Sequence, residues 1–301
     1  MDALTSLPGV VDVSLVPGTG ARPGAELDLI VEVPHGATRT EDYTALAQLL
    51  ESPLPASLID FFYVNTDAGA YELGDAIARG IATAEPARTV AIVRSRIPRT
   101  FIDCNRRIDA SAAEFREGKV TPGLMPWITS PADRKLLRER YDAYVGTVRD
   151  ACARLRPDGA MLLLHTYAPR SVDVEVDLDI VTNLHRAWQP DVEPTWPLRP
   201  EVDVISRTVD GVSHAPVRVV DGLREAFAAL GIAVADSATY PLHPSTLASE
   251  HVMRLPGRAL CVEIRRDLLA APFEPFAEMR IDPAKVARMA GPLVAAVRRW
   301  W

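Results

Sequence analysis

Six short apolar stretches recur along the chain, and each has the length of a buried β-strand. Most are rich in valine and isoleucine and are bounded by glycine, proline or polar residues, a pattern typical of strands inside a sheet. The predicted strands are residues 10–16, 27–33, 89–95, 160–166, 202–206 and 259–265.

Between these stretches the apolar residues recur three or four positions apart, as in amphipathic helices. Three prolines stand where helices begin and one glycine stands where a helix ends, at Pro131, Pro216, Pro283 and Gly231. The chain ends in two tryptophans, which indicate either a docked last helix or a subunit contact, and the oligomeric state stays open. The predicted helices are residues 66–82, 131–155, 216–231 and 282–300.

Strands that alternate with helices predict an α/β fold. We expect one domain over residues 1–301, with three α/β/α layers and a mixed, largely parallel central sheet. No stretch has the composition of a linker between domains. Residues 167–201 are rich in proline, acids and tryptophan and lack a clear period, which predicts a long irregular insertion or lid.

The composition is that of a globular protein with a large core. Of the 301 residues, 48% are apolar and 24% are charged, and the mean hydropathy is +0.03. The formal charge of −7 and the absence of a lysine or arginine block argue against nucleic acid and anionic membranes as partners. The chain has neither a basic segment before an apolar N-terminal core nor a run of 18 apolar residues, so we expect a cytoplasmic protein.

The three cysteines do not predict a disulfide framework or a thiolate zinc site. Cys104, Cys152 and Cys261 are odd in number and lack metal-ligand spacing. Cys104 lies in a polar stretch and could be a catalytic thiol, but a small buried residue is the favoured interpretation.

Two histidines follow predicted strands, His35 after LIVEVP and His165 after AMLLL. Both side chains should lie at the carboxyl edge of the sheet, where a metal could be held between them with a carboxylate as third ligand. The alternative is that each histidine caps its strand and bonds a carbonyl group. The other four, at 185, 214, 243 and 251, fall in predicted loops and are expected mainly at the surface.

Two acids stand out by their positions. Asp67 precedes a predicted helix and is either its N-cap or a ligand. Glu263 lies inside an apolar strand, where a buried carboxylate is unfavourable unless it is paired or has a chemical role such as general base. The alternatives for Glu263 are an ion pair with Arg265 or a place on the solvated face of an edge strand.

A polar cluster follows the strand at 89–95. It contains Arg99, Asp103, Asn105 and Arg106. An arginine beside an asparagine suits the recognition of a substrate carboxylate, because the guanidinium donates two parallel hydrogen bonds and the amide adds another. The alternative is a set of surface ion pairs.

Five motifs in this order resemble the N-formylglutamate amidohydrolase family, which belongs to the zinc carboxypeptidase-like hydrolases. The resemblance covers residues 33 to 269 and implies a phosphorylase/hydrolase-like α/β fold. The motifs are VPHGATR (33–39), TDAGAYELGDAIA (66–78), RTFIDCNR (99–106), LLLHTYAP (162–169) and CVEIRRDLL (261–269).

The resemblance implies a role for each of seven residues. The metal ligands would be His35, Asp67 and His165, with one Zn²⁺ or another divalent ion per chain. Glu263 would be the general base and Arg99 would stabilise the oxyanion. Asn105 and Arg106 would grip the carboxylate of an acyl amino acid.

The chain departs from relatives at several positions. In classical zinc carboxypeptidases a glutamate follows the first histidine by three residues, whereas Thr38 stands there here, so the carboxylate must come from elsewhere. Glu32 should point away because it lies on the strand before the turn. Thr166 and Ala68 replace the serine and tryptophan that are usual in formylglutamate enzymes.

The predicted function is metal-dependent hydrolysis of the amide of an N-acyl, N-formyl-like amino acid with a free carboxylate. One alternative is a carboxypeptidase or aminoacylase that acts on another acyl amino acid or peptide. A second is a catalytically silent member of the fold that binds a small metabolite. A hydrolase that uses the Cys104 thiol is the least favoured.

Overall fold

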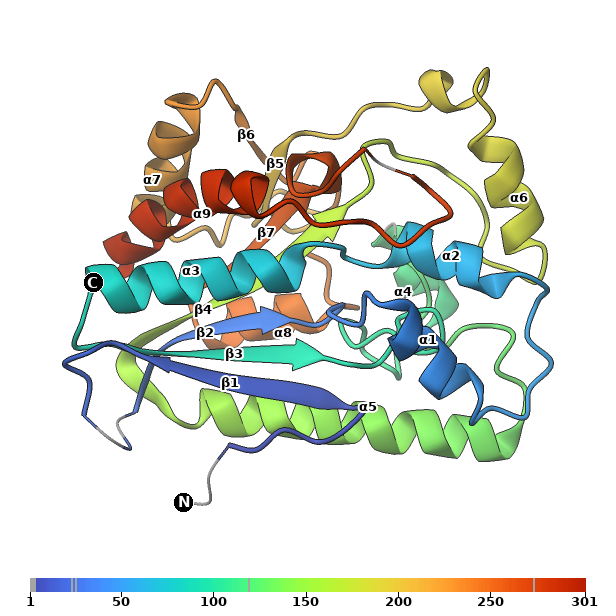
Figure 1. Ribbon diagram of the computed structural model, residues 1–301, viewed down its shortest axis with the longest axis horizontal. Coiled ribbons are helices and arrows are strands. Elements are labelled where there is room, and N and C mark those ends of the chain that lie inside the picture. The colour runs from blue at the N-terminus through green and yellow to red at the C-terminus, as the bar shows by residue number, and fades with distance from the viewer. Residues whose placement is uncertain (1–3, 23, 25, 119, 273) are drawn as a thin grey trace.

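A seven-stranded sheet runs through the middle of the molecule (Figure 1). The structure is a computed structural model that describes residues 4–22, 24, 26–118, 120–272 and 274–301. The strand order is β1-β3-β2-β4-β7-β5-β6. The four central strands β3, β2, β4 and β7 are parallel, whereas β1 is antiparallel to β3 and β5 is antiparallel to β7. The strands are β1 Val11–Pro17, β2 Leu27–Val33, β3 Thr89–Ser95, β4 Leu155–Tyr167, β5 Val202–Ile205, β6 Val234–Asp236 and β7 Ala259–Arg265.

Helices cover both faces of the sheet, as Figure 1 shows with α3, α7 and α9 on one side and α5 on the other. Alternate residues of each central strand enter the two apolar cores. On β2, for example, Leu29 and Val31 face the α3 side and Ile30 faces the α5 side. The helices are α1 Thr40–Ala47, α2 Leu58–Asn65, α3 Ala70–Ala84, α4 Ala112–Glu117, α5 Pro131–Cys152, α6 Ile180–Ala187, α7 Val217–Ala228, α8 Leu247–Arg254 and α9 Pro283–Val297, with 3₁₀ turns at Glu193–Thr195, Arg266–Leu268 and Arg298–Trp300.

The α/β class and the mixed, largely parallel sheet are confirmed. All six predicted strands form, and the structure adds the three-residue edge strand β6. The four predicted helices also form, but α3 begins four residues later than expected and α5 ends at Cys152, because β4 already begins at Leu155. The last helix is docked on its own chain: the Trp300 indole donates to the Gly257 carbonyl at 3.0 Å, and the Arg88 guanidinium lies 3.8 Å from the Trp301 ring centroid.

Five short helices were not predicted, namely α1, α2, α4, α6 and α8. Each has six to eight residues, and helices this short owe their stability to packing rather than to intrinsic propensity. Helix α6 lies inside the 167–201 segment, which was expected to be irregular, and is held by the buried side chains of Ile180, Leu184 and Ala187. Among the described residues, no helix has the length and apolarity needed to cross a membrane.

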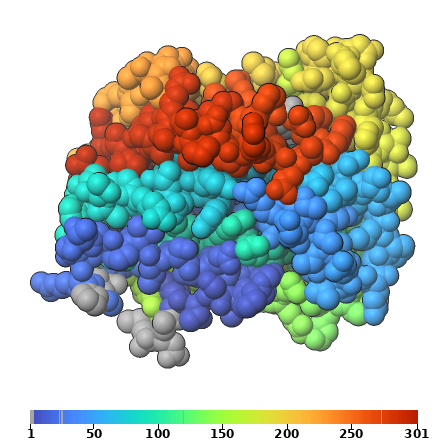
Figure 2. All heavy atoms as spheres, in the orientation of Figure 1, coloured from blue at the N-terminus to red at the C-terminus, as the bar shows by residue number. Residues whose placement is uncertain are grey.

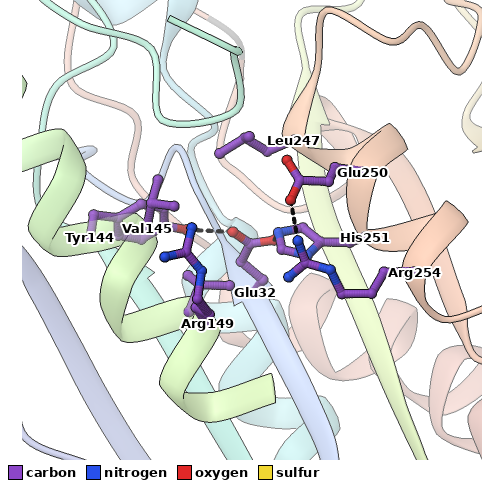
Figure 3. Close-up of a pocket in the computed structure, with 9 residues that line it drawn as sticks. Glu32, Tyr144, Val145, Arg149, Leu247, Glu250, His251 and Arg254 are labelled. Carbon is purple, nitrogen blue, oxygen red and sulfur yellow. Dashed lines mark hydrogen bonds and ion pairs between the residues drawn. The ribbon is translucent and has the colours of Figure 1, made fainter. Parts of the chain in front are cut away.

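Glu32 lies on β2 and points toward α5 and α8, into the small pocket of Figure 3. Its Oε1 accepts a 2.8 Å hydrogen bond from the Tyr144 hydroxyl, and its Oε2 lies 3.9 Å from Nε2 of His251. Burial raises the pKa of Glu32 to about 7, although the bond from Tyr144 opposes the shift. Glu32 therefore points away from the first histidine motif, as expected.

Replacing Glu32 with Gln should stabilise the protein at pH 8 but much less at pH 5. Because the pKa of folded Glu32 lies above its unfolded value, its contribution to stability is greatest below pH 4.5 and is lost as the pH rises to about 7. A shift from 4.5 to about 7 corresponds to about 3 kcal/mol. The free energy of unfolding in denaturant at the two pH values measures the effect. The exposed control Glu41→Gln should change the free energy of unfolding by less than about 0.5 kcal/mol. An equal gain for Glu32→Gln at both pH values would contradict the assignment.

Candidate metal centre and active site

Four neighbouring parallel strands bring the predicted site residues to one edge of the sheet. His35 follows β2 by two residues, His165 lies near the end of β4, and the 99–106 segment follows β3. Glu263 on β7 is the register partner of His165. Ligands of open α/β sheets bind beyond the carboxyl ends of the strands, so this edge is the candidate site.

His35, Asp67 and His165 place three ligand atoms in a nearly equilateral triangle. Asp67 Oδ2 lies 3.2 Å from Nδ1 of His35 and 3.0 Å from Nδ1 of His165, and the two nitrogens are 3.2 Å apart. All three side chains are buried, and in the described part of the chain they are the one such group of three that could hold an ion. Tetrahedral zinc with bonds of about 2.0–2.1 Å spaces its ligand atoms by about 3.3 Å, so the donor set fits this ion and leaves one position open.

Asp67 does not cap α3, because Gly69 is the N-cap residue and no side chain caps that helix. Instead, Asp67 Oδ2 faces the two histidines and also accepts from the Thr166 backbone N–H at 3.2 Å. Burial alone would raise the pKa of the Asp67 carboxyl, but the two histidines beside it hold the pKa well below its usual range. The carboxylate is therefore ionised, as a metal ligand must be.

Asp103 holds the far side of the His35 ring, a contact that the sequence did not reveal. His35 Nε2 donates to Asp103 Oδ1 at 2.7 Å. Because Nε2 carries the proton, the lone pair of His35 Nδ1 points into the triangle and is free to bind a metal. Burial would raise the pKa of Asp103, but the guanidinium groups of Arg106 and Arg99, together with His35, hold it well below its usual range. A carboxylate behind a histidine in this way orients the ring and increases its basicity as a ligand.

Asp103→Asn should weaken zinc binding about 10- to 100-fold, because the amide is a poorer partner for the His35 ring than the carboxylate. Competition with a chromophoric chelator measures the affinity. Saturating zinc should restore much of the activity, since the three candidate ligands remain in place. Zinc affinity equal to that of the wild type would contradict a positioning role for Asp103.

Glu263 lies beside His165 on the neighbouring strand. Its Oε2 is buried and has no hydrogen-bond partner. Burial raises the pKa of Glu263 to about 7, against the influence of His165 and with a smaller contribution from Asp67. The proposed ion pair with Arg265 does not form, because that guanidinium bonds Asp267 at 2.8 Å. A carboxyl with this pKa can accept a proton near neutral pH.

The cluster after β3 is largely buried, so its interpretation as surface ion pairs is wrong. Arg99 donates to Asp103 Oδ2 at 2.8 Å and lies 3.5 Å from Asp67 Oδ1. The Arg106 guanidinium donates to the backbone carbonyls of Thr121 and Asn105, both at 3.1 Å. Asn105 Nδ2 lies 3.4 Å from Nε2 of His165. Arg99 and Asn105 thus lie beside members of the triangle, whereas Arg106 is linked to it through Asp103, 3.5 Å from its Nη2.

The model of the N-formylglutamate amidohydrolase family matches residues 27–270, which include the triangle and all four strand ends. The chain belongs to this family. It is therefore a member of a family of amidohydrolases, as the five motifs predicted. No curated protein matches the chain.

Three solved structures are similar to this chain, and the first of them supports a shared fold. The crystal structure of N-formylglutamate amidohydrolase from Ralstonia eutropha JMP134 aligns with a TM-score of 0.56 and 17% identity, over 95% of this chain and 96% of that chain. A gene product of Agrobacterium tumefaciens aligns with a TM-score of 0.49 and 16% identity, over 96% and 94% of the two chains. A metallo-carboxypeptidase from Burkholderia cenocepacia aligns with a TM-score of 0.39 and 12% identity, over 98% of this chain and 65% of that chain.

Other candidate residues of this family member lie away from the triangle or have structural roles. Cys104 is buried against the Ser95 hydroxyl, and burial raises the pKa of its thiol far above the usual range, which supports a packing role. The surface prediction is wrong for His243 and His251, which are buried. His185 is half-exposed on α6 rather than in a loop.

The 167–201 segment and the loop after β7 both contact elements near the edge of the sheet that carries the site. Figure 2 shows the 171–200 stretch in yellow at one end of the molecule, beside the early helices in blue. His185 of α6 bonds Asp60 of α2 at 2.7 Å, and its ring stacks on Phe276 at 4.2 Å. Met279 packs against Ala68, next to the candidate ligand Asp67. These contacts connect the 167–201 segment and the loop after β7 to the elements around the site.

Proposed function

We propose that this protein is a zinc-dependent amidohydrolase that cleaves the amide of an N-acyl, N-formyl-like amino acid with a free carboxylate. The observation that carries the proposal is the buried triangle of His35, Asp67 and His165, with Glu263 beside it. Family membership supports amide hydrolysis, and the chemistry of the donor set supports zinc. No nucleic acid or membrane is required for this function, and we place the protein in the cytoplasm.

Zinc, when bound, would polarise the amide carbonyl and lower the pKa of a water from ~15.7 toward ~7. Glu263 would accept the proton of the attacking water at its unpartnered Oε2. The water oxygen forms a bond to the acyl carbon, and the carbon–nitrogen bond then breaks. Glu263 returns the proton to the leaving nitrogen, so that the products are a carboxylic acid and an amine.

The arginines would complete the site. Arg99 has one edge toward Asp103 and approaches the triangle at Asp67, where it would donate to the developing oxyanion. Asn105 and Arg106 would orient the substrate carboxylate. Two of the Arg106 donors are bonded to protein carbonyls, and its Nη2 lies 3.5 Å from the Asp103 carboxylate, so its contribution is chiefly a fixed positive charge.

Hydrolysis assays on the zinc-loaded protein test the proposal. N-formyl-L-glutamate, N-acetyl-L-glutamate and a dipeptide with a C-terminal glutamate should be compared at equal concentration. We expect the formyl substrate to be cleaved fastest. Faster cleavage of the acetyl compound or the dipeptide would instead assign an aminoacylase or a carboxypeptidase, and no cleavage of any by the zinc-loaded protein would favour a binding protein.

A further inference from the structure

Arg94 lies between the two chain segments that carry the candidate ligands His35 and Asp67. It stands near the end of β3, and its register partner Val33 is two residues before His35. Its side chain is on the α3 face of the sheet, as are those of its strand neighbours at 90 and 92. Only 9% of Arg94 is exposed. A buried guanidinium is unfavourable unless its charge and donors are used, so its contacts identify its role.

The first contact of Arg94 fixes the turn that follows His35. Arg94 Nε donates to the Gly36 carbonyl at 2.7 Å. A Cβ atom at position 36 would lie only 2.4 Å from Arg94 Cγ, so the approach requires the glycine that stands there. Further along the turn, Asp42 accepts from the Thr38 backbone N–H at 3.1 Å and lies 4.0 Å from Arg94 Nη2. The guanidinium therefore holds the backbone one residue away from a candidate ligand.

The second contact of Arg94 fixes the start of α3, which follows Asp67. The guanidinium lies over the ring of Tyr71, with Cζ 4.3 Å from the ring centroid. Tyr71 is the second residue of α3 and comes four positions after Asp67. The attraction between a cation and an aromatic face is strongest where water is excluded. One buried arginine thus joins the segment of His35 to the segment of Asp67.

The triangle depends on how these two segments lie relative to each other. Asp67 Oδ2 is 3.2 Å from His35 Nδ1, although the two residues are 32 positions apart. Thr66 also joins the segments, because its hydroxyl donates to the Ala37 carbonyl at 2.8 Å. With this second link in place, we expect loss of the Arg94 contacts to shift the ligand atoms rather than to unfold the site. Metal sites tolerate shifts of only about 0.5 Å without loss of function.

We propose that Arg94 is a positioning residue of the metal centre and sets the spacing of His35 and Asp67 through the Gly36 carbonyl and the Tyr71 ring. This rests on the proposed function, since it requires an ion in the triangle. Arg94 contacts neither the ion nor the substrate in this role. It acts through the backbone of the two segments that supply ligands.

Arg88 offers a matched control at the other end of β3. It also makes one side-chain hydrogen bond, to Asp28 at 2.9 Å, and it also lies over an aromatic ring, 3.8 Å from the centroid of Trp301. Arg88 directly precedes β3, whereas the candidate ligands lie beyond the carboxyl ends of the parallel strands. A variant at this position loses the same two kinds of contact without touching the segments of His35 and Asp67.

The test compares the zinc affinity of Arg94→Met and Arg88→Met by competition with a chromophoric chelator. Arg94→Met should bind zinc about 10- to 100-fold more weakly than the wild type. Arg88→Met should stay within about 3-fold of it, as expected for a distant site. Arg94→Lys keeps the charge and a donor and should recover part of the affinity. The visible absorption of Co²⁺ bound in place of zinc reports the coordination geometry and should change in Arg94→Met but not in Arg88→Met.

A wild-type zinc affinity and cobalt spectrum in Arg94→Met overturn the proposal. An equal weakening in Arg88→Met also overturns it, because the effect would then follow from lost stability alone. If Arg94→Met does not fold, as judged by circular dichroism, the cobalt spectrum of Arg94→Lys decides: a shift from the wild-type spectrum supports the role and an unchanged spectrum removes it.

Hydrolysis assays on the same proteins separate this inference from the proposed function. If the wild type binds zinc but cleaves no amide, and Arg94→Met binds zinc more weakly, the positioning role stands and the hydrolase falls. If the wild type cleaves the amide and Arg94→Met binds zinc equally well, the hydrolase stands and the positioning role falls. A wild type that binds no zinc overturns both.

Discussion

Glu263→Gln should reduce kcat by about 10²- to 10⁴-fold while the zinc content stays at the wild-type level. The carboxylate lies on β7 beside His165, and its Oε2 is buried without a partner. Burial raises the pKa of Glu263 to about 7, so that it can take a proton from water and return it to the leaving amine. Glutamine has the same shape but cannot accept that proton. Turnover assays and metal analysis on the same preparation measure both quantities.

Glu32→Gln is the matched control for this experiment. Glu32 is also a buried glutamate on a central strand whose pKa burial raises to about 7, but it faces Tyr144 and His251 rather than the triangle. We expect its turnover to stay within about 3-fold of wild type, as for a substitution away from the reacting atoms. If Glu263→Gln loses its zinc, Glu263 is a metal ligand. If that variant keeps full activity, Glu263 is not the general base.

Asp67→Ala should abolish both zinc binding and measurable turnover. Asp67 supplies the one carboxylate oxygen of the triangle, 3.0 Å from His165 and 3.2 Å from His35. Two histidines alone leave the ion with too few protein ligands for a tight site. The substitution also leaves the Thr166 backbone N–H without its side-chain acceptor and removes the ion pair between Asp67 and Arg99, so some loss of stability is expected.

Zinc analysis and thermal unfolding of Asp67→Ala separate the two effects. Asp103→Asn is the graded comparison, because it removes a supporting charge and keeps all three candidate ligands. We expect a folded Asp67→Ala protein with no tightly held zinc and an Asp103→Asn protein with weakened binding. Retention of one tightly bound zinc in Asp67→Ala would show that the carboxylate ligand lies elsewhere.

The central strands could be predicted closely from the sequence. Strands β2 and β7 have the predicted bounds, Leu27–Val33 and Ala259–Arg265, because parallel strands buried on both faces are continuous apolar runs. Helix α6 was missed although its buried residues Ile180, Leu184 and Ala187 have helical spacing. Its eight residues are fewer than the roughly 11 to 18 over which a period is usually read, and the segment around it is rich in proline and acids.

The site could be predicted only in part for a similar reason. The histidines stand out because each follows an apolar strand, whereas Asp67 reads equally well as a helix cap until the fold brings it to partners 32 and 98 positions away. Arg265 and Arg266 are the same residue type in adjacent positions. Only the structure shows that one is fully paired and the other has an unused, buried donor.

The metal content of the purified protein, beside His35→Ala and His165→Ala, tests the central claim most directly. The account predicts about one zinc per wild-type chain and none held tightly by either variant, since each histidine supplies one corner of the triangle. A wild-type protein that holds no zinc, even after addition of the ion and dialysis, would contradict the account, and so would variants that retain the wild-type amount.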